Sequence, residues 1–226
     1  MLTQKQLANI TRLQKIKQKQ FRSVPADGTL VEYLGKKFIV YPNVFWPYED
    51  SMLLVQKFVI NPGERVLDIG TGCGVIAIMA ANQGAKQVVA VDINPAAIQA
   101  TNQNARKHGV ANIIDARCSN LFAQLHNNEI FDVITVNLPY RNKTAKDDVE
   151  ASFWDSEFNS YKNFFSNVHK YLNKHGRIYL AQANYGDIDA MKQLAKAAGL
   201  DVKLIGKKAM AKDDPRIFYA FVLRRK

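Results

Sequence analysis

Residues 65–81, RVLDIGTGCGVIAIMAA, constrain the fold of this 226-residue chain more than any other stretch. The apolar residues of 66–69 predict a buried strand, which ends at the glycine-rich run 70–74. The apolar run 75–81 is long enough for a buried helix. Strand, glycine-rich turn and helix in this order open a nucleotide-binding βαβ unit. We therefore expect an anionic group to bind against the turn and the start of the helix.

Two details of this stretch indicate the ligand. A dinucleotide fingerprint would need glycine at position 75, where this chain has valine, so NAD is disfavoured. The pattern is instead D-x-G-x-G-x-G, and its carboxylate suits a ligand with an ammonium group. The methionine half of S-adenosylmethionine carries both an ammonium and a carboxylate, which fit the acid and the helix end together. A purely structural turn is the alternative. The residues expected to bind are Asp68, Gly70, Thr71, Gly72 and Gly74.

Polar residues also follow the next predicted strands. Residues 87–92 read as a buried strand ending in Asp92, about 20 residues beyond the glycine turn, as expected for the acid that binds ribose hydroxyls. Residues 111–119 supply a third strand, after which Asn120 is expected to cap a short helix. A fourth strand ends in the run Asn-Leu-Pro-Tyr at 137–140, and the polar residues 141–156 predict a mobile loop.

The whole pattern predicts a doubly wound α/β fold with a mostly parallel, seven-stranded sheet. Five strands alternate with helices, and the runs 200–206 and 216–224 close the sheet as a C-terminal antiparallel hairpin. We divide the chain into a basic N-terminal helix and β-hairpin extension, residues 1–42, and a main domain, residues 43–226.

This arrangement resembles the class I methyltransferases that depend on S-adenosylmethionine, over roughly residues 40–226. The resemblance implies a Rossmann-like methyltransferase domain, with S-adenosylmethionine as cofactor and S-adenosylhomocysteine as product. Asparagine at 120 departs from the aspartate often found there to hold the adenine amino group, but its side-chain oxygen still accepts that hydrogen bond. The resemblance extends the cofactor site from Asp92 to Ile93, Asn120 and Leu121.

Within this class, NLPY is similar to the [N/D]-x-P-Y motif of enzymes that methylate the exocyclic amines of bases or the glutamine amide. Such an amino group is a poor nucleophile because its lone pair is delocalised. By analogy, Asn137 Oδ1 and the Leu138 carbonyl accept its two N–H bonds, Pro139 stiffens the turn, and Tyr140 stacks on the planar group. A structural strand-end turn is the alternative.

Residues 44–54, VFWPYEDSMLL, resemble the segment that covers the cofactor in glutamine methyltransferases of the release-factor type. The resemblance implies that Phe45, Pro47 and Asp50 contact the cofactor; a plain amphipathic helix is the alternative. One departure is Leu138, where those enzymes usually have proline. The run NLPY is more typical of rRNA adenine dimethyltransferases.

The chain carries 31 basic and 20 acidic residues, for a formal charge of +11. This surplus fits a polyanionic partner such as RNA or a ribosome, or else a solvated lysine-rich surface. The basic surface expected to contact RNA or a translation-factor substrate includes Lys15, Lys17, Lys19, Arg22, Lys36 and Lys37. We expect no membrane span and no metal site, both cysteines (Cys73 and Cys118) in the core, and a cytoplasmic location.

The sequence thus predicts an N-methyltransferase that uses S-adenosylmethionine and methylates a planar amino nitrogen. A base amine of ribosomal or transfer RNA is the preferred acceptor, because of NLPY, Asn120 and the charge. The alternative is N5-methylation of a protein glutamine, as in a release factor. A non-catalytic binding subunit with the same fold is a more distant alternative.

Overall fold

A seven-stranded sheet forms the centre of the computed structural model, which describes residues 2–211 and 213–226. Its strand order is β5-β4-β3-β6-β7-β9-β8. The strands are β3 (Arg65–Ile69), β4 (Gln87–Asp92), β5 (Ile114–Cys118), β6 (Phe131–Val136), β7 (Leu172–Ala183), β8 (Leu200–Ala209) and β9 (Ile217–Arg225). β3 to β7 are parallel, whereas β9 pairs antiparallel with both β7 and β8. The predicted doubly wound sheet with its closing hairpin is confirmed, with the antiparallel strand between two others rather than at the edge.

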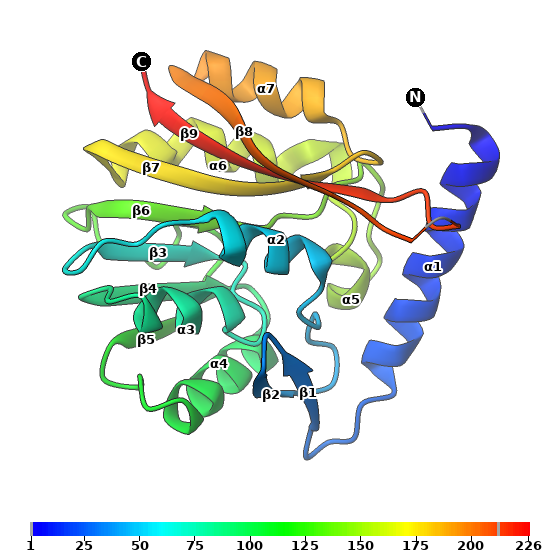
Figure 1. Cartoon of the computed structure of the whole chain (residues 1–226), viewed down its shortest axis with the longest axis horizontal. Coiled ribbons are helices and arrows are strands. Elements are labelled where there is room, and N and C mark those ends of the chain that lie inside the picture. Colours follow the sequence, from blue (N-terminus) through cyan, green and yellow to red (C-terminus); the bar gives the residue numbers. More distant parts are fainter. Residues whose placement is uncertain (1, 212) are drawn as a thin grey trace.

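Helices cover both faces of this sheet (Figure 1). One face carries α2 (Glu49–Lys57), α3 (Val75–Asn82) and α4 (Pro95–Lys107), and the other carries α6 (Asn159–Asn167) and α7 (Ile188–Ala197). The 3₁₀ turns η1 (Ser156–Phe158) and η2 (Val168–Lys170) flank α6. α3 is apolar on all sides because it is buried between the sheet and its neighbouring helices. Two hydrophobic clusters, one on each face, form the core.

The predicted N-terminal hairpin is confirmed as β1 (Thr29–Tyr33) and β2 (Lys36–Val40). It packs against α4, where the Asn104 side chain accepts from the Ile39 amide at 2.7 Å and donates to the Ile39 carbonyl at 2.8 Å. Phe38 and Val40 lie in the same buried cluster as residues of β3. The boundary at residue 42 stays a prediction, but the extension and the main domain share this core.

The helix α1 (Gln4–Arg22) begins at Thr3, whose hydroxyl accepts from the Gln6 amide. It lies beyond the carboxyl ends of the parallel strands, away from both helical layers (Figure 1). Its buried residues are Ile10, Gln14, Gln18 and Phe21. This spacing of three and four residues places one face of the helix against the rest of the protein.

Residues 141–156, whose polarity predicts a mobile loop, contain a short helix and hydrogen-bond to α1. They include α5 (Asp148–Ala151), and Val149, Trp154 and Asp155 are buried. The guanidinium of Arg141 donates to Thr11 Oγ1 of α1 at 2.7 Å. Arg141 and Trp154 thus hydrogen-bond to α1, whereas Asn142, Thr144 and Asp148 of the same segment stay exposed.

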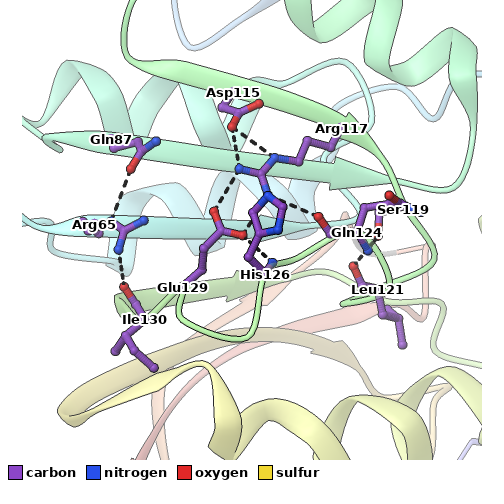
Figure 2. Close-up of polar contacts among 10 residues, drawn as sticks. All are labelled: Arg65, Gln87, Asp115, Arg117, Ser119, Leu121, Gln124, His126, Glu129 and Ile130. Carbon is purple, nitrogen blue, oxygen red and sulfur yellow. Dashed lines mark hydrogen bonds and ion pairs between the residues drawn. The ribbon is translucent and has the colours of Figure 1, made fainter.

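An ion-pair network around Arg117 holds the connection from β5 to β6. Figure 2 shows its guanidinium between the carboxylates of Asp115 and Glu129, at 2.6 and 2.8 Å. Glu129 and Asp115 raise the pKa of Arg117, and Arg117 in turn lowers the pKa of Glu129. The network anchors both ends of the segment that follows β5.

The turn directly after β5 differs from the prediction in two respects. Residues 121–124 form a turn and not a helix, so Asn120 caps no helix, and the turn is held by Ser119 Oγ, which accepts from the Gln124 amide at 3.0 Å. Cys118 is exposed, so its predicted place in the core is wrong, whereas Cys73 is buried as predicted. β5 is an edge strand, which leaves Cys118 at its end open to solvent.

Candidate functional site

The carboxyl ends of β3, β4 and β6 open into a cavity of about 300 Å³. Ligands of doubly wound folds bind at this edge of the sheet, where the strand order reverses. Asp68 and Gly74 do not line the cavity. The other predicted site residues do: Phe45, Pro47, Asp50, Gly70, Thr71, Gly72, Asp92, Ile93, Asn120, Leu121, Asn137, Leu138, Pro139 and Tyr140.

One carboxylate ties together the turns that follow β3 and β4. Asp92 accepts hydrogen bonds from the backbone amides of Gly72 and Asn94, both at 2.9 Å. Gly70 and Gly72 have φ of 72° and 56°, in the left-handed region that favours glycine. Burial raises the pKa of Asp92. The glycine turn is therefore a rigid wall of the cavity with backbone exposed on it.

Asp68 lies fully buried in β3, next to this turn. Its Oδ1 accepts from Thr135 Oγ1 at 2.7 Å, whereas Oδ2 has no hydrogen-bond partner among the described residues. Burial raises the pKa of Asp68 to about 6, against the opposing effect of the Thr135 hydrogen bond. The Thr71 side chain also lowers the pKa of this carboxyl, and Asp68 does not line the cavity, so its carboxylate acts on a ligand through its charge rather than by direct contact.

The run 137–140 follows β6 and is held by a carboxylate of α2. Tyr140 Oη lies 2.5 Å from Asn137 Oδ1 and 2.8 Å from Asp50 Oδ2. The Tyr140 ring meets Tyr185 edge to face, with ring centroids 5.8 Å apart. Asp50, which the sequence assigns to the cofactor, thus contacts the residues expected to hold the acceptor.

Three residues of α1 that sequence analysis missed also line the cavity: Gln14, Lys17 and Phe21. Their spacing of three and four residues could have predicted that they act together, because it places them on one face of the helix. Lys17 was expected on the basic surface, but it is half-buried and its Nζ lies 5.2 Å from the centroid of the Tyr48 ring. Burial and the neighbouring Arg216 lower the pKa of Lys17.

Phe21 completes an aromatic wall of the cavity. Its ring stacks on Trp46 and on Phe153, with centroid separations of 5.9 and 5.7 Å, and meets Phe45 edge on at 5.5 Å. Such ring pairs add about 0.5–1.5 kcal/mol each beyond area burial. No sequence pattern pointed to Phe153, because it comes from the segment that reads as a polar loop.

Polar contacts fasten α1 to residues 141–155. Gln14 Oε1 accepts from Arg141 at 3.1 Å and from Trp154 Nε1 at 3.3 Å. Arg22 pairs with Asp147 at 2.7 Å, but this exposed pair contributes only about 0–1 kcal/mol. Removing α1 would therefore change the cavity itself as well as the charge of the protein.

Residues that follow β7 and precede β9 form the remaining wall. Tyr185 and Arg216 line the cavity, and Arg216 donates to Tyr48 Oη at 2.9 Å. At Gly186, an added Cβ would lie 2.7 Å from the Tyr140 carbonyl oxygen, so only glycine leaves room for the 137–140 turn. Tyr185 could have been predicted from the sequence, because it follows β7, the parallel neighbour of β6. Adjacent parallel strands end at the same edge of the sheet.

Over residues 2–211 and 213–226, no group of three or more His, Cys, Asp or Glu side chains is placed to hold a metal ion. No helix in the described part of the chain is both long and apolar enough to span a bilayer.

The sequence is similar to known methyltransferases. Residues 41–199 match the family model of the methyltransferase small domain. The putative protein N5-glutamine methyltransferase of Methanocaldococcus jannaschii is 33% identical over 183 residues, which cover 77% of this chain and 90% of that protein. The release factor glutamine methyltransferase of Koribacter versatilis is 33% identical over 131 residues, 56% of this chain and 46% of that protein.

The fold is also found among solved structures. The 16S rRNA N2 G1207 methyltransferase of T. thermophilus, solved with S-adenosylmethionine and guanosine, superposes with a TM-score of 0.64 at 19% identity. That match covers 88% of this chain and 50% of the other. The chain belongs to the methyltransferase small domain family and is an N-methyltransferase that depends on S-adenosylmethionine.

Proposed function

We propose that this enzyme methylates the side-chain amide nitrogen of a protein glutamine. The observation that carries the proposal is the 33% identity, over 77% of this chain, to a putative protein N5-glutamine methyltransferase. The release factor glutamine methyltransferase supports the same acceptor over a shorter stretch. The sequence alone favoured an RNA base amine, but the likeness to the rRNA enzyme, at 19% identity, concerns the fold only.

The cofactor site of this proposal lies along the ends of β3, β4 and β5. Asp68 lies directly behind the glycine turn, outside the cavity lining, and we assign its buried negative charge to attract the ammonium group of the methionine half. Ile93, 60% exposed, offers an apolar surface to a flat ring, and Asp92 keeps lone pairs for ribose hydroxyls. The assigned cofactor residues are Phe45, Pro47, Asp68, Gly70, Thr71, Gly72, Gly74, Asp92, Ile93, Asn120 and Leu121.

The acceptor site is the run 137–140. S-adenosylmethionine, when bound, would supply an electrophilic methyl group to the nitrogen, with S-adenosylhomocysteine as the leaving group and one N–H proton released to water. Asn137 Oδ1 and the Leu138 carbonyl accept the two N–H bonds of the amide, which fixes the nitrogen and favours a localised lone pair. Pro139 stiffens the turn and Tyr140 presents its ring. Positioning and a preorganised field then supply much of the rate.

The proposal is tested by incubating the enzyme with methyl-labelled S-adenosylmethionine and either total protein or total RNA from the same extract. We expect label in protein, and mass spectrometry of digests should place it on the glutamine side chain. A reaction with Asn137→Ala provides the background. Label confined to RNA would contradict the glutamine assignment.

The raised pKa of Asp68 predicts pH-dependent cofactor binding. Only the carboxylate form attracts an ammonium group, so affinity is complete above the pKa of about 6 and falls as pH decreases through it. S-adenosylhomocysteine should bind roughly tenfold more weakly at pH 5 than at pH 7. Calorimetry across this range measures the effect, and Asp68→Asn should bind weakly with no such dependence. A pH profile identical in both proteins would remove Asp68 from the ammonium site.

An RNA base amine remains the second candidate, because one observation favours it. The outer face of α1 exposes Lys5, Arg12, Lys15 and Lys19, and the helix contains no acidic residue. Such a face suits phosphate contacts, which position a nucleic acid without reading its sequence. The remaining residues of the expected basic surface, Lys36 and Lys37, lie on β2 beside His108 at the end of α4.

Changing the four exposed α1 residues together to glutamine tests this candidate. If they bind RNA phosphates, the slope of log affinity against log salt should flatten by about 0.7–0.9 for each phosphate that is no longer neutralised. The affinity for S-adenosylhomocysteine should not change, because none of the four lines the cavity. Filter binding measures the slope, and the matched control is Lys192→Gln/Lys196→Gln, two exposed lysines of α7 outside the expected basic surface, which should leave the slope unchanged. Absence of RNA binding by the intact protein near about 50 mM salt, where phosphate contacts are strongest, would remove the candidate.

A further inference from the structure

The hydroxyl of Tyr140 lies within hydrogen-bond distance of two oxygen atoms, and it cannot donate to both at the same time. Its Oη lies 2.8 Å from Asp50 Oδ2 and 2.5 Å from Asn137 Oδ1. A phenol has one proton, so one of these contacts needs a donor on the other side. The oxygen and nitrogen of an asparagine amide occupy nearly equivalent positions and are assigned from their hydrogen-bond partners. Asn137 therefore satisfies both contacts when its Nδ2, rather than Oδ1, faces Tyr140.

The charge on Asp50 decides which way this chain of hydrogen bonds runs. An ionised carboxylate only accepts, so it takes the Tyr140 proton; Tyr140 Oη must then accept from the amide N–H₂ of Asn137. That arrangement turns Asn137 Oδ1 away from Tyr140 and leaves it free to accept from a substrate. If Asp50 is neutral, Tyr140 is free to donate to Asn137 Oδ1 and to compete with the substrate for it.

Two side chains of the acceptor run favour the ionised form of Asp50 against the effect of burial: Tyr140 donates to it, and the Asn137 side chain also lowers its pKa. It is 5% exposed, its Oδ1 accepts from the Ser51 amide at 2.7 Å, and it lies in the first turn of α2, where the helix dipole favours negative charge. Tyr33 of β1 and Tyr185 after β7 are the other titratable groups facing it. No described lysine, arginine or histidine forms an ion pair with it.

We propose that Asp50 is a positioning residue: through Tyr140 it orients the Asn137 amide so that Oδ1 faces the methyl acceptor. This inference rests on the proposed function only in the role given to Asn137, and holds for a glutamine amide or a base amine alike. It reassigns Asp50, which sequence resemblance placed at the cofactor, to the acceptor side of the cavity.

A double-mutant cycle of Asp50→Asn and Tyr140→Phe tests the proposal. The probe is the initial rate of label transfer from S-adenosylmethionine to the total-protein extract. Asp50→Asn keeps the shape but lets an amide donate to Tyr140, so the rate should fall about 10- to 100-fold. Tyr140→Phe removes the hydroxyl that could donate to Asn137 Oδ1. In this background Asp50→Asn should therefore change the rate less than about twofold.

Two measurements distinguish this positioning role from a role of Asp50 in protein stability or in cofactor binding. The affinity of Asp50→Asn for S-adenosylhomocysteine should stay within about threefold of the parent. The Asn137 side-chain NH₂ signals, identified by their disappearance in Asn137→Ala, should shift in NMR spectra as falling pH protonates Asp50. Burial raises the pKa of that carboxyl. This transition should be missing from Asp50→Asn and from Tyr140→Phe.

Three results would overturn the proposal: an equal rate loss in both backgrounds, a loss of cofactor affinity as large as the rate loss, or Asn137 signals that ignore pH in the parent protein. The NMR transition requires no substrate. If it is present while label appears in RNA and not in protein, the glutamine assignment fails and the role of Asp50 stands.

Discussion

Replacing Asn137 by alanine should lower turnover by about 10²–10³-fold, the loss typical of one preorganised polar contact to the transition state. The affinity for S-adenosylhomocysteine should change little, because the assigned role of Asn137 is at the acceptor nitrogen. The nitrogen of an amide or base amine keeps its lone pair in conjugation unless its N–H bonds are held. Without Oδ1, one N–H has no acceptor, and the nitrogen is both less reactive and less well placed.

Single-turnover transfer of labelled methyl to protein measures this effect, and calorimetry measures cofactor affinity in the same variant. Asn167→Ala is a matched control, since Asn167 ends α6 and, among the residues that the structure describes, its side chain bonds to Asn163 and Lys170 alone. Full turnover in Asn137→Ala would show that the run 137–140 is a structural turn.

Replacing Asp92 by alanine should weaken S-adenosylhomocysteine binding by about 10- to 100-fold. Charge-assisted hydrogen bonds to ribose hydroxyls are worth about 1.5–3 kcal/mol in total. The same carboxylate also holds the amides of Gly72 and Asn94, so the variant should melt at a lower temperature. Asp92→Asn retains one acceptor oxygen but turns an amide N–H₂ toward a backbone donor, and it should therefore rescue only part of the affinity.

Calorimetry with S-adenosylhomocysteine tests this prediction. The control is Asp115→Ala on the neighbouring strand β5, whose carboxylate pairs with Arg117 and does not line the cavity (Figure 2). Its binding should match the parent protein even if its stability falls. Unchanged affinity in Asp92→Ala would remove Asp92 from the cofactor site.

Sequence patterns predicted the sheet and the residues at the strand ends because these features are local. The run 65–81 combines an apolar strand, a glycine turn and an apolar helix within 17 consecutive positions. This order is typical of the opening of a βαβ unit. Asp92 and Asn137 follow strands that the apolar runs delimit. Once those strands are parallel neighbours, their ends meet at one edge without further information.

The rest of the cavity depends on contacts between segments far apart in the chain. Gln14 bonds to Trp154, and Phe21 stacks on Phe153, but neither end of either pair signals its partner in the sequence. Polarity therefore gave no sign of the contacts that 141–156 makes with α1. The contact of Asp50 with Tyr140 could not be predicted either, because it joins residues 90 positions apart.

The position of β9 between β7 and β8 determines the order in which these strands unfold. Among the described strands, β9 is the one neighbour to which β8 pairs, so β8 can open while the other strands stay paired. β9 lies between β7 and β8 and cannot leave without freeing both neighbours. Phe218 on β9 and Arg216 just before it belong to the cavity wall. Amide hydrogen exchange should thus be faster in β8 than in β9, because fraying of the edge strand is a partial unfolding that leaves the catalytic cavity closed.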